Sequence, residues 1–97
     1  MTPEAFRRST SAAHPPADLP PPLAALWHDD KGDWATAHRI VMNAQSAAAA
    51  WVHAYLHRKE GDLENARYWY RKAKRPEATG TLEDEWMAIA ETLLARD

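Results

Sequence analysis

The chain has 97 residues, enough for a single domain, and its lack of cysteine excludes disulfides, cysteine-ligated zinc and thiol nucleophiles. Its formal net charge of −2 gives no global reason to expect a nucleic-acid partner. Five tryptophans provide bulk for a small aromatic core, and abundant alanine with few β-branched residues favours helices over strands.

Residues 1–18 are predicted to form a flexible N-terminal tail, and residues 19–97 a single helical domain. The tail is rich in Ser, Thr, Ala, Pro and charged residues, with Phe6 as its apolar anchor. Within it, Thr2-Pro3-Glu4 is typical of the start of a short helical turn. It has no apolar stretch resembling a signal peptide, and no later run is long enough to cross a membrane. We therefore expect a cytoplasmic protein without a membrane partner.

An internal repeat follows the tail. Residues 23–45 align with residues 52–74 at a shift of 29 residues. The identical pairs are Ala25/Ala54, His28/His57, Gly32/Gly61, Asp33/Asp62, Ala37/Ala66 and Ala44/Ala73. Repeats of about this length are typical of helix hairpins that cannot bury their apolar face alone and therefore pack on a neighbour.

Each repeat contains the signals of a tight turn between two helices. Gly32 and Gly61 favour a helix end, because glycine tolerates the left-handed conformation there, and Asp33 and Asp62 follow as N-caps of the next helix. The expected helices span about 22–31, 33–44, 46–60, 62–74 and 82–95. The sequence thus predicts an all-α fold of two antiparallel helix hairpins, followed by an amphipathic C-terminal closing helix.

The stretch AYLHRKEGDLENARYWYRKA, residues 54–73, resembles the tetratricopeptide and Sel1-like helical repeats. The matching residues are Ala54, Gly61, Ala66, Tyr70 and Ala73. The segment HRKEGDLENARYWYR also resembles short bacterial and fungal proteins. These resemblances imply a bacterial interaction module and no particular enzymatic activity. The 29-residue period is shorter than the usual 34, which leaves open whether the hairpins stack as a solenoid or close into a compact bundle.

Histidines are the main candidates for chemistry. His53 and His57 lie four residues apart on one helix face, Glu60 follows one turn later, and His28 repeats the position of His57. Two histidines and a carboxylate are a candidate polar, metal or acid–base site. There is no HExxH motif, and zinc needs three or four ligands. The favoured interpretation is therefore structural histidines bonded near the turns, and no cofactor is predicted.

A second candidate is the helical stripe of Trp51, Tyr55, Arg58 and Lys59. By its resemblance to the repeat superfamily, this stripe would line a concave binding groove suited to an acidic peptide or a carboxylate. The alternative is that Trp51 and Tyr55 pack against the first hairpin or the closing helix, since a small core needs its large residues.

The functional prediction is an interaction or scaffolding module with a protein or peptide partner. Homodimerisation is a variant, because a two-repeat array leaves apolar ends exposed. The alternative is a small metal- or histidine-dependent enzyme or ligand-binding protein using His28, His53, His57 and Glu60. The aromatic and basic residues of 67–75 resemble those of single-strand nucleic-acid binders, but Trp69 and Tyr70 fall on the expected buried face, so no nucleic-acid partner is predicted.

Overall fold

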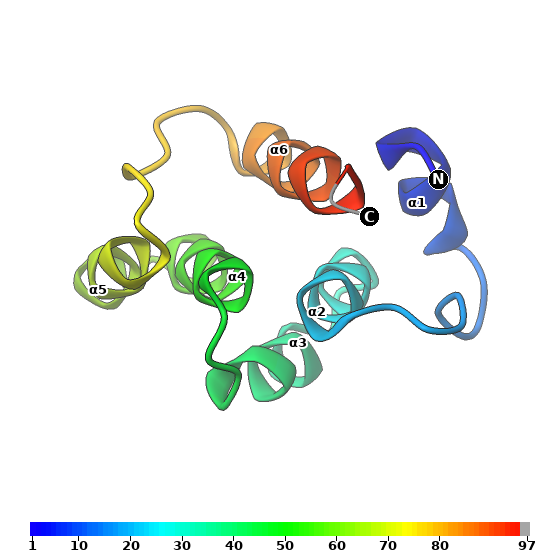
Figure 1. Ribbon diagram of the computed structural model, residues 1–97, viewed down its shortest axis with the longest axis horizontal. Helices are drawn as coiled ribbons and strands as arrows, with labels where there is room; N and C mark the ends of the chain where they lie inside the picture. Colours follow the sequence, from blue (N-terminus) through cyan, green and yellow to red (C-terminus); the bar gives the residue numbers. More distant parts are fainter. Residues whose placement is uncertain (96–97) are drawn as a thin grey trace.

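A computed structural model describes residues 1–95 of the chain, and within them all regular structure is helical (Figure 1). The expected hairpin helices and closing helix form close to their predicted positions, which confirms the all-α class. The helices are α1 Pro3–Ser9, α2 Pro21–Asp30, α3 Trp34–Met42, α4 Ala47–Lys59, α5 Leu63–Ala73 and α6 Leu82–Leu94.

The two predicted turns have the same geometry. Gly32 and Gly61 adopt φ values of 87° and 86°, the left-handed region in which a glycine avoids the strain of a Cβ. The amide that follows each glycine donates to a carbonyl of the preceding helix at 2.9 Å, from Asp33 to His28 and from Asp62 to His57. The carboxylates of these two aspartates then accept from the amides of Thr36 and Asn65, at 3.2 and 3.3 Å, and so cap α3 and α5.

The N-terminal segment differs from the predicted tail. Residues 3–9 form α1, which begins at the Thr2 cap and carries the fully buried side chain of Phe6. The Phe6 ring stacks on Trp86 of α6 at a centroid distance of 5.6 Å. Composition predicted a tail because it averages over the segment, whereas one aromatic side chain anchors α1 to the closing helix.

The helices pack around α4. Along the chain α2, α3, α4 and α5 contact one another in sequence, while α6 packs against α2 and α4 on the side away from α3 (Figure 1). Helix α1 lies on the same side as α6 and contacts both α6 and α2. Nine of the thirteen residues of α4 are buried, so this helix is covered on more than one face.

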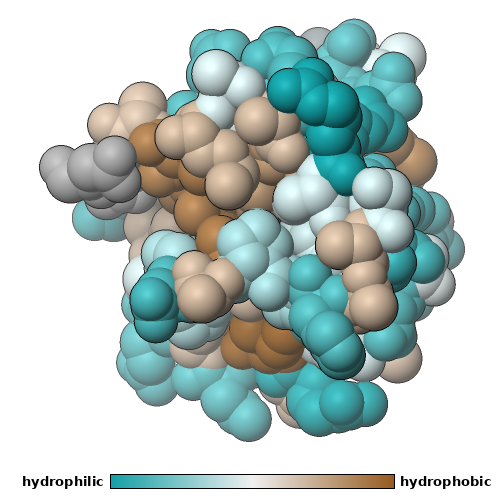
Figure 2. Space-filling view, turned by 90° about the vertical axis from the view of Figure 1, so that its right-hand side faces the viewer, coloured by the Kyte–Doolittle hydropathy of each residue, from teal (hydrophilic) through white to brown (hydrophobic). Residues whose placement is uncertain are grey.

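The face that carries α1 shows hydrophilic side chains surrounding apolar surface near its centre and left (Figure 2). A separate feature of the surface is a pocket of about 380 Å³ between the start of α2 and the end of α6, lined by Pro20, Pro21, Pro22, Leu23, Ser46, Ala48 and Leu93. Among the described helices, none combines the length and apolar character needed to span a bilayer.

Candidate metal centre

The residues of the predicted groove, Trp51, Tyr55, Arg58 and Lys59, bind side chains of this same chain. Trp51 and Tyr55 are buried. The indole Nε1 of Trp51 donates to Glu85 of α6 at 3.2 Å, and Arg58 donates to the same carboxylate at 2.9 Å. The closing helix therefore covers Trp51 and Arg58, while peptide binding stays a prediction of the sequence.

The other half of the stripe binds a second internal carboxylate. The hydroxyl of Tyr55 donates to Asp29 of α2 at 2.8 Å, and the ammonium group of Lys59 lies 3.0 Å from the same residue. Burial and the neighbouring Asp29 charge raise the pKa of Tyr55, which keeps its hydroxyl protonated as a donor. The carboxylates that these four side chains bind belong to this chain.

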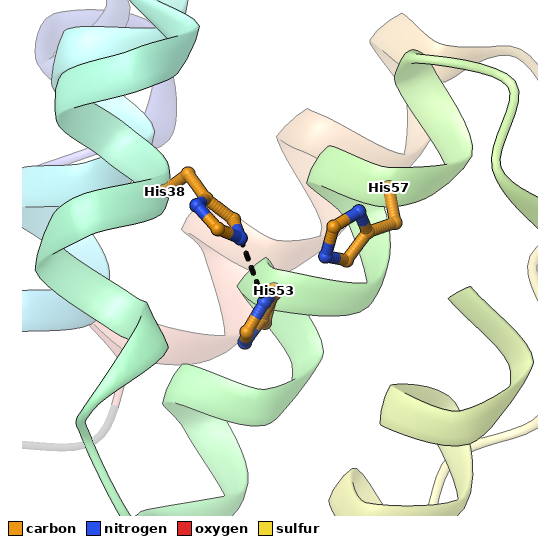
Figure 3. A group of neighbouring side chains, drawn as sticks. All are labelled: His38, His53 and His57. Carbon is orange, nitrogen blue, oxygen red and sulfur yellow. Dashed lines mark hydrogen bonds between the residues drawn. The ribbon is translucent and has the colours of Figure 1, made fainter. Parts of the chain in front are cut away.

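The opposite side of α4 carries a cluster of three histidines. His53 and His57 of α4 lie beside His38 of α3, and the three ring centroids are 4.8, 4.9 and 5.1 Å apart. One ligand atom from each ring lies within 4.8 Å of the other two. Figure 3 shows one nitrogen of every ring directed toward the centre of this triangle.

Two of these nitrogens already lie at nearly the separation that a shared metal ion requires. The Nε2 atoms of His38 and His53 are 3.1 Å apart. Two imidazole nitrogens that bind one zinc ion tetrahedrally at about 2.0–2.1 Å lie about 3.3 Å from each other. A pair in direct contact thus needs only a small adjustment to hold an ion between them.

Glu60 orients the ring of His57 from the side that faces away from the other two histidines. Its carboxylate lies 2.6 Å from Nδ1 of His57, which leaves Nε2 free to face His38 and His53 (Figure 3). A carboxylate on the far nitrogen of a ligating histidine fixes the tautomer and raises the basicity of the donor atom. The predicted partnership of His57 and Glu60 therefore exists, with the carboxylate placed to support the ring.

Two indole rings flank the cluster. Trp34 stacks on His38 at a centroid distance of 4.8 Å, and Trp69 of α5 stacks on His53 at 3.9 Å. Trp34 is held in place because its Nε1 donates to the carbonyl of Leu56 at 2.9 Å. These contacts restrict the rotation of two of the three histidines.

The surroundings favour neutral imidazoles. Burial, followed by the charges of His57 and His38, lowers the pKa of His53 from 6.5 to about 4. Burial, followed by the charge of His57, also lowers the pKa of His38. Both rings are therefore unprotonated near neutral pH, which is the state in which histidine binds metals.

One ring nitrogen of the cluster has no hydrogen-bond partner among the described residues. This atom, Nδ1 of His53, is buried. When Nε2 binds a metal, the proton of a neutral imidazole resides on Nδ1. The His53 side of the cluster therefore lacks the outer hydrogen bond that Glu60 provides to His57, and this weakens the site relative to a fully supported one.

His28 stands apart from this cluster. Its ring packs edge-on against Trp27 of α2 at 5.1 Å, and it is not among the converging donors. The predicted set of His28, His53, His57 and Glu60 thus contains one residue that the structure does not bring to the site.

His38 takes the place that the sequence prediction assigned to His28. The repeat alignment directed attention to His28, because His28 and His57 are equivalent, whereas the equivalent of His38 is Arg67. The available signal was a histidine on each of two successive helices that were expected to pack together.

Comparisons with protein-family models, with curated proteins and with solved structures give no match for this chain.

Proposed function

We propose that this protein binds one transition-metal ion, Zn²⁺ in preference to others, through the Nε2 atoms of His38, His53 and His57. The observation that carries the proposal is the convergence of three imidazole donors from two helices, with the Glu60 carboxylate on the far nitrogen of one of them.

The donor set supports the choice of metal. Imidazole nitrogens suit Zn²⁺, Cu²⁺ and Ni²⁺, whereas Mg²⁺ and Ca²⁺ prefer oxygen ligands. Zinc accepts a tetrahedral arrangement without an electronic penalty, while Cu²⁺ and Ni²⁺ favour square-planar or tetragonal ones. Three rings that meet at the corners of a nearly regular triangle fit the tetrahedral case.

The test is a zinc titration of the full chain after removal of metal with a chelator, followed by competition with a chromophoric chelator. We expect one equivalent of Zn²⁺ to bind. His38→Ala is the most informative ligand variant, because His38 is only half-buried and its loss disturbs the core least. Glu60→Gln should weaken binding by about 10–100-fold, and His38→Ala by more than that.

His28→Ala is the matched control. It removes a histidine at the repeat position equivalent to His57, and it should leave the zinc affinity unchanged. Binding of much less than one equivalent by the folded wild-type protein, or equal affinity of wild type and His38→Ala, would show that no such centre exists.

A further inference from the structure

The number of protein ligands determines how many coordination positions of a bound metal ion stay open. Within residues 1–95, the group of mutually close donors that contains His38 and His53 is completed by His57 alone. Glu60 contacts the far nitrogen of His57, so its carboxylate is already engaged away from the centre of the triangle. Three protein ligands leave one tetrahedral position for a further ligand, the pattern of catalytic zinc sites as opposed to closed structural ones.

Charge determines the class of that ligand. Imidazole is an uncharged ligand when it binds a metal, so three histidines leave the full double positive charge of a divalent ion in place. The carboxylate of Glu60 lies on the far side of His57. A small anion in the remaining position would bring the centre close to neutrality. Water at such a position has its pKa lowered to about 7, so hydroxide itself becomes a ligand near neutral pH.

The surroundings limit the size of the ligand. His53 and His57 are buried, and His38 is the member of the cluster that reaches the surface. Trp34 and Trp69, both half-buried, stack on two of the rings. Because the indoles cover these two imidazoles, a bulky ligand would have to displace an aromatic ring.

We infer that the metal ion keeps one exchangeable coordination position, and that this position takes a small anionic donor, either hydroxide or a carboxylate group. This inference rests on the proposed metal-binding function. It assigns Glu60 the role of an orienting residue that stays outside the coordination shell, and it makes the centre one that can bind and release a ligand.

The experiment uses Co²⁺ as a spectroscopic substitute for zinc and sodium azide as the anionic probe. After one equivalent of Co²⁺ is bound, azide should change the visible absorption bands saturably, with one azide per ion. Sodium perchlorate at the same ionic strength should have no effect, because it does not coordinate. Unchanged bands in azide, with Co²⁺ bound at one equivalent, would overturn this inference while leaving metal binding intact. Failure to bind Co²⁺ and Zn²⁺ would overturn both.

The variant Glu60→Gln distinguishes two cases: a fourth coordination position that is open to exchange, and one that the Glu60 carboxylate occupies. If Glu60 only orients His57, the variant should bind azide a few-fold more tightly than wild type, because a negative charge near the ion is gone. If azide leaves the Co²⁺ absorption bands of wild type unchanged but alters those of Glu60→Gln, Glu60 is itself the fourth ligand and the inference is wrong. His28→Ala should respond to azide as wild type does.

Discussion

Two histidines at equivalent repeat positions have different roles because their neighbours differ. His28 packs edge-on against Trp27, while His57 is aligned by Glu60 and lies next to His38 and His53. The site therefore depends on which residues the next helix presents to each ring. A shared position in a repeat predicts a shared backbone location and does not predict shared chemistry.

The metal-free protein should lose stability in mild acid. His53 has a folded-state pKa of about 4 against 6.5 when unfolded, so the folded state binds fewer protons between these values. Its contribution is present above pH 6.5 and is lost as the pH falls toward 4, by at most about 3 kcal/mol. The groups that face this ring are His38 of α3 and His57 of α4, with Glu60 behind His57.

Urea unfolding in the presence of a chelator, at pH 7.5 and pH 5, measures this loss. His53→Gln removes the titrating ring, so the variant should show a smaller decrease in the free energy of unfolding over the same interval. An identical decrease in both proteins would mean that other groups cause the acid sensitivity.

At the scale of the element, the two hairpin turns are near copies. Both glycines have left-handed φ values, and both following aspartates cap the next helix through their carboxylates. The signals act over three to five residues, so the same short motif produces the same turn in two places.

Gly32→Ala and Gly61→Ala should each lower the free energy of unfolding by about 1–2 kcal/mol. A Cβ at either position meets no atom within 4 Å, so the cost comes from backbone conformation and not from a collision. Gly61→Asn should recover part of the loss, because asparagine tolerates this region. Thermal or urea unfolding compares the variants, and equal stability of Gly61→Ala and wild type would contradict this account of the turn.

At the scale of the molecule, α6 closes the fold through a buried carboxylate. Glu85 is 5% exposed and accepts hydrogen bonds from Trp51 and Arg58 of α4 and, at 2.6 Å, from Tyr70 of α5. Trp86, the next residue, donates through Nε1 to the carbonyl of Leu26 in α2. Helix α6 covers one side of the helix array together with α1, which contacts α6 and α2. Self-association stays a prediction of the sequence.

Glu85→Ala should destabilise the protein by about 3–5 kcal/mol, because it leaves the largely buried Arg58 without its counter-charge. Glu83→Ala is the matched control in the same helical turn. Glu83 is exposed and pairs with Arg7 at 3.0 Å, so its loss should cost less than about 1 kcal/mol. Chemical denaturation measures both, and equal effects would refute the assignment of Glu85 as the anchor of α6.

The sequence alone determined the helices from α2 to α6, the two aspartate caps and the two glycine turns, since these depend on neighbours within a few residues. Only the tertiary structure decided which faces of α4 are covered and by what. Trp51 meets Glu85 across 34 positions, and His53 meets His38 across 15, in pairings that depend on how whole helices pack. For that reason the predicted groove residues bind carboxylates of α2 and α6, and the proposed metal centre includes a histidine that the repeat pattern did not single out.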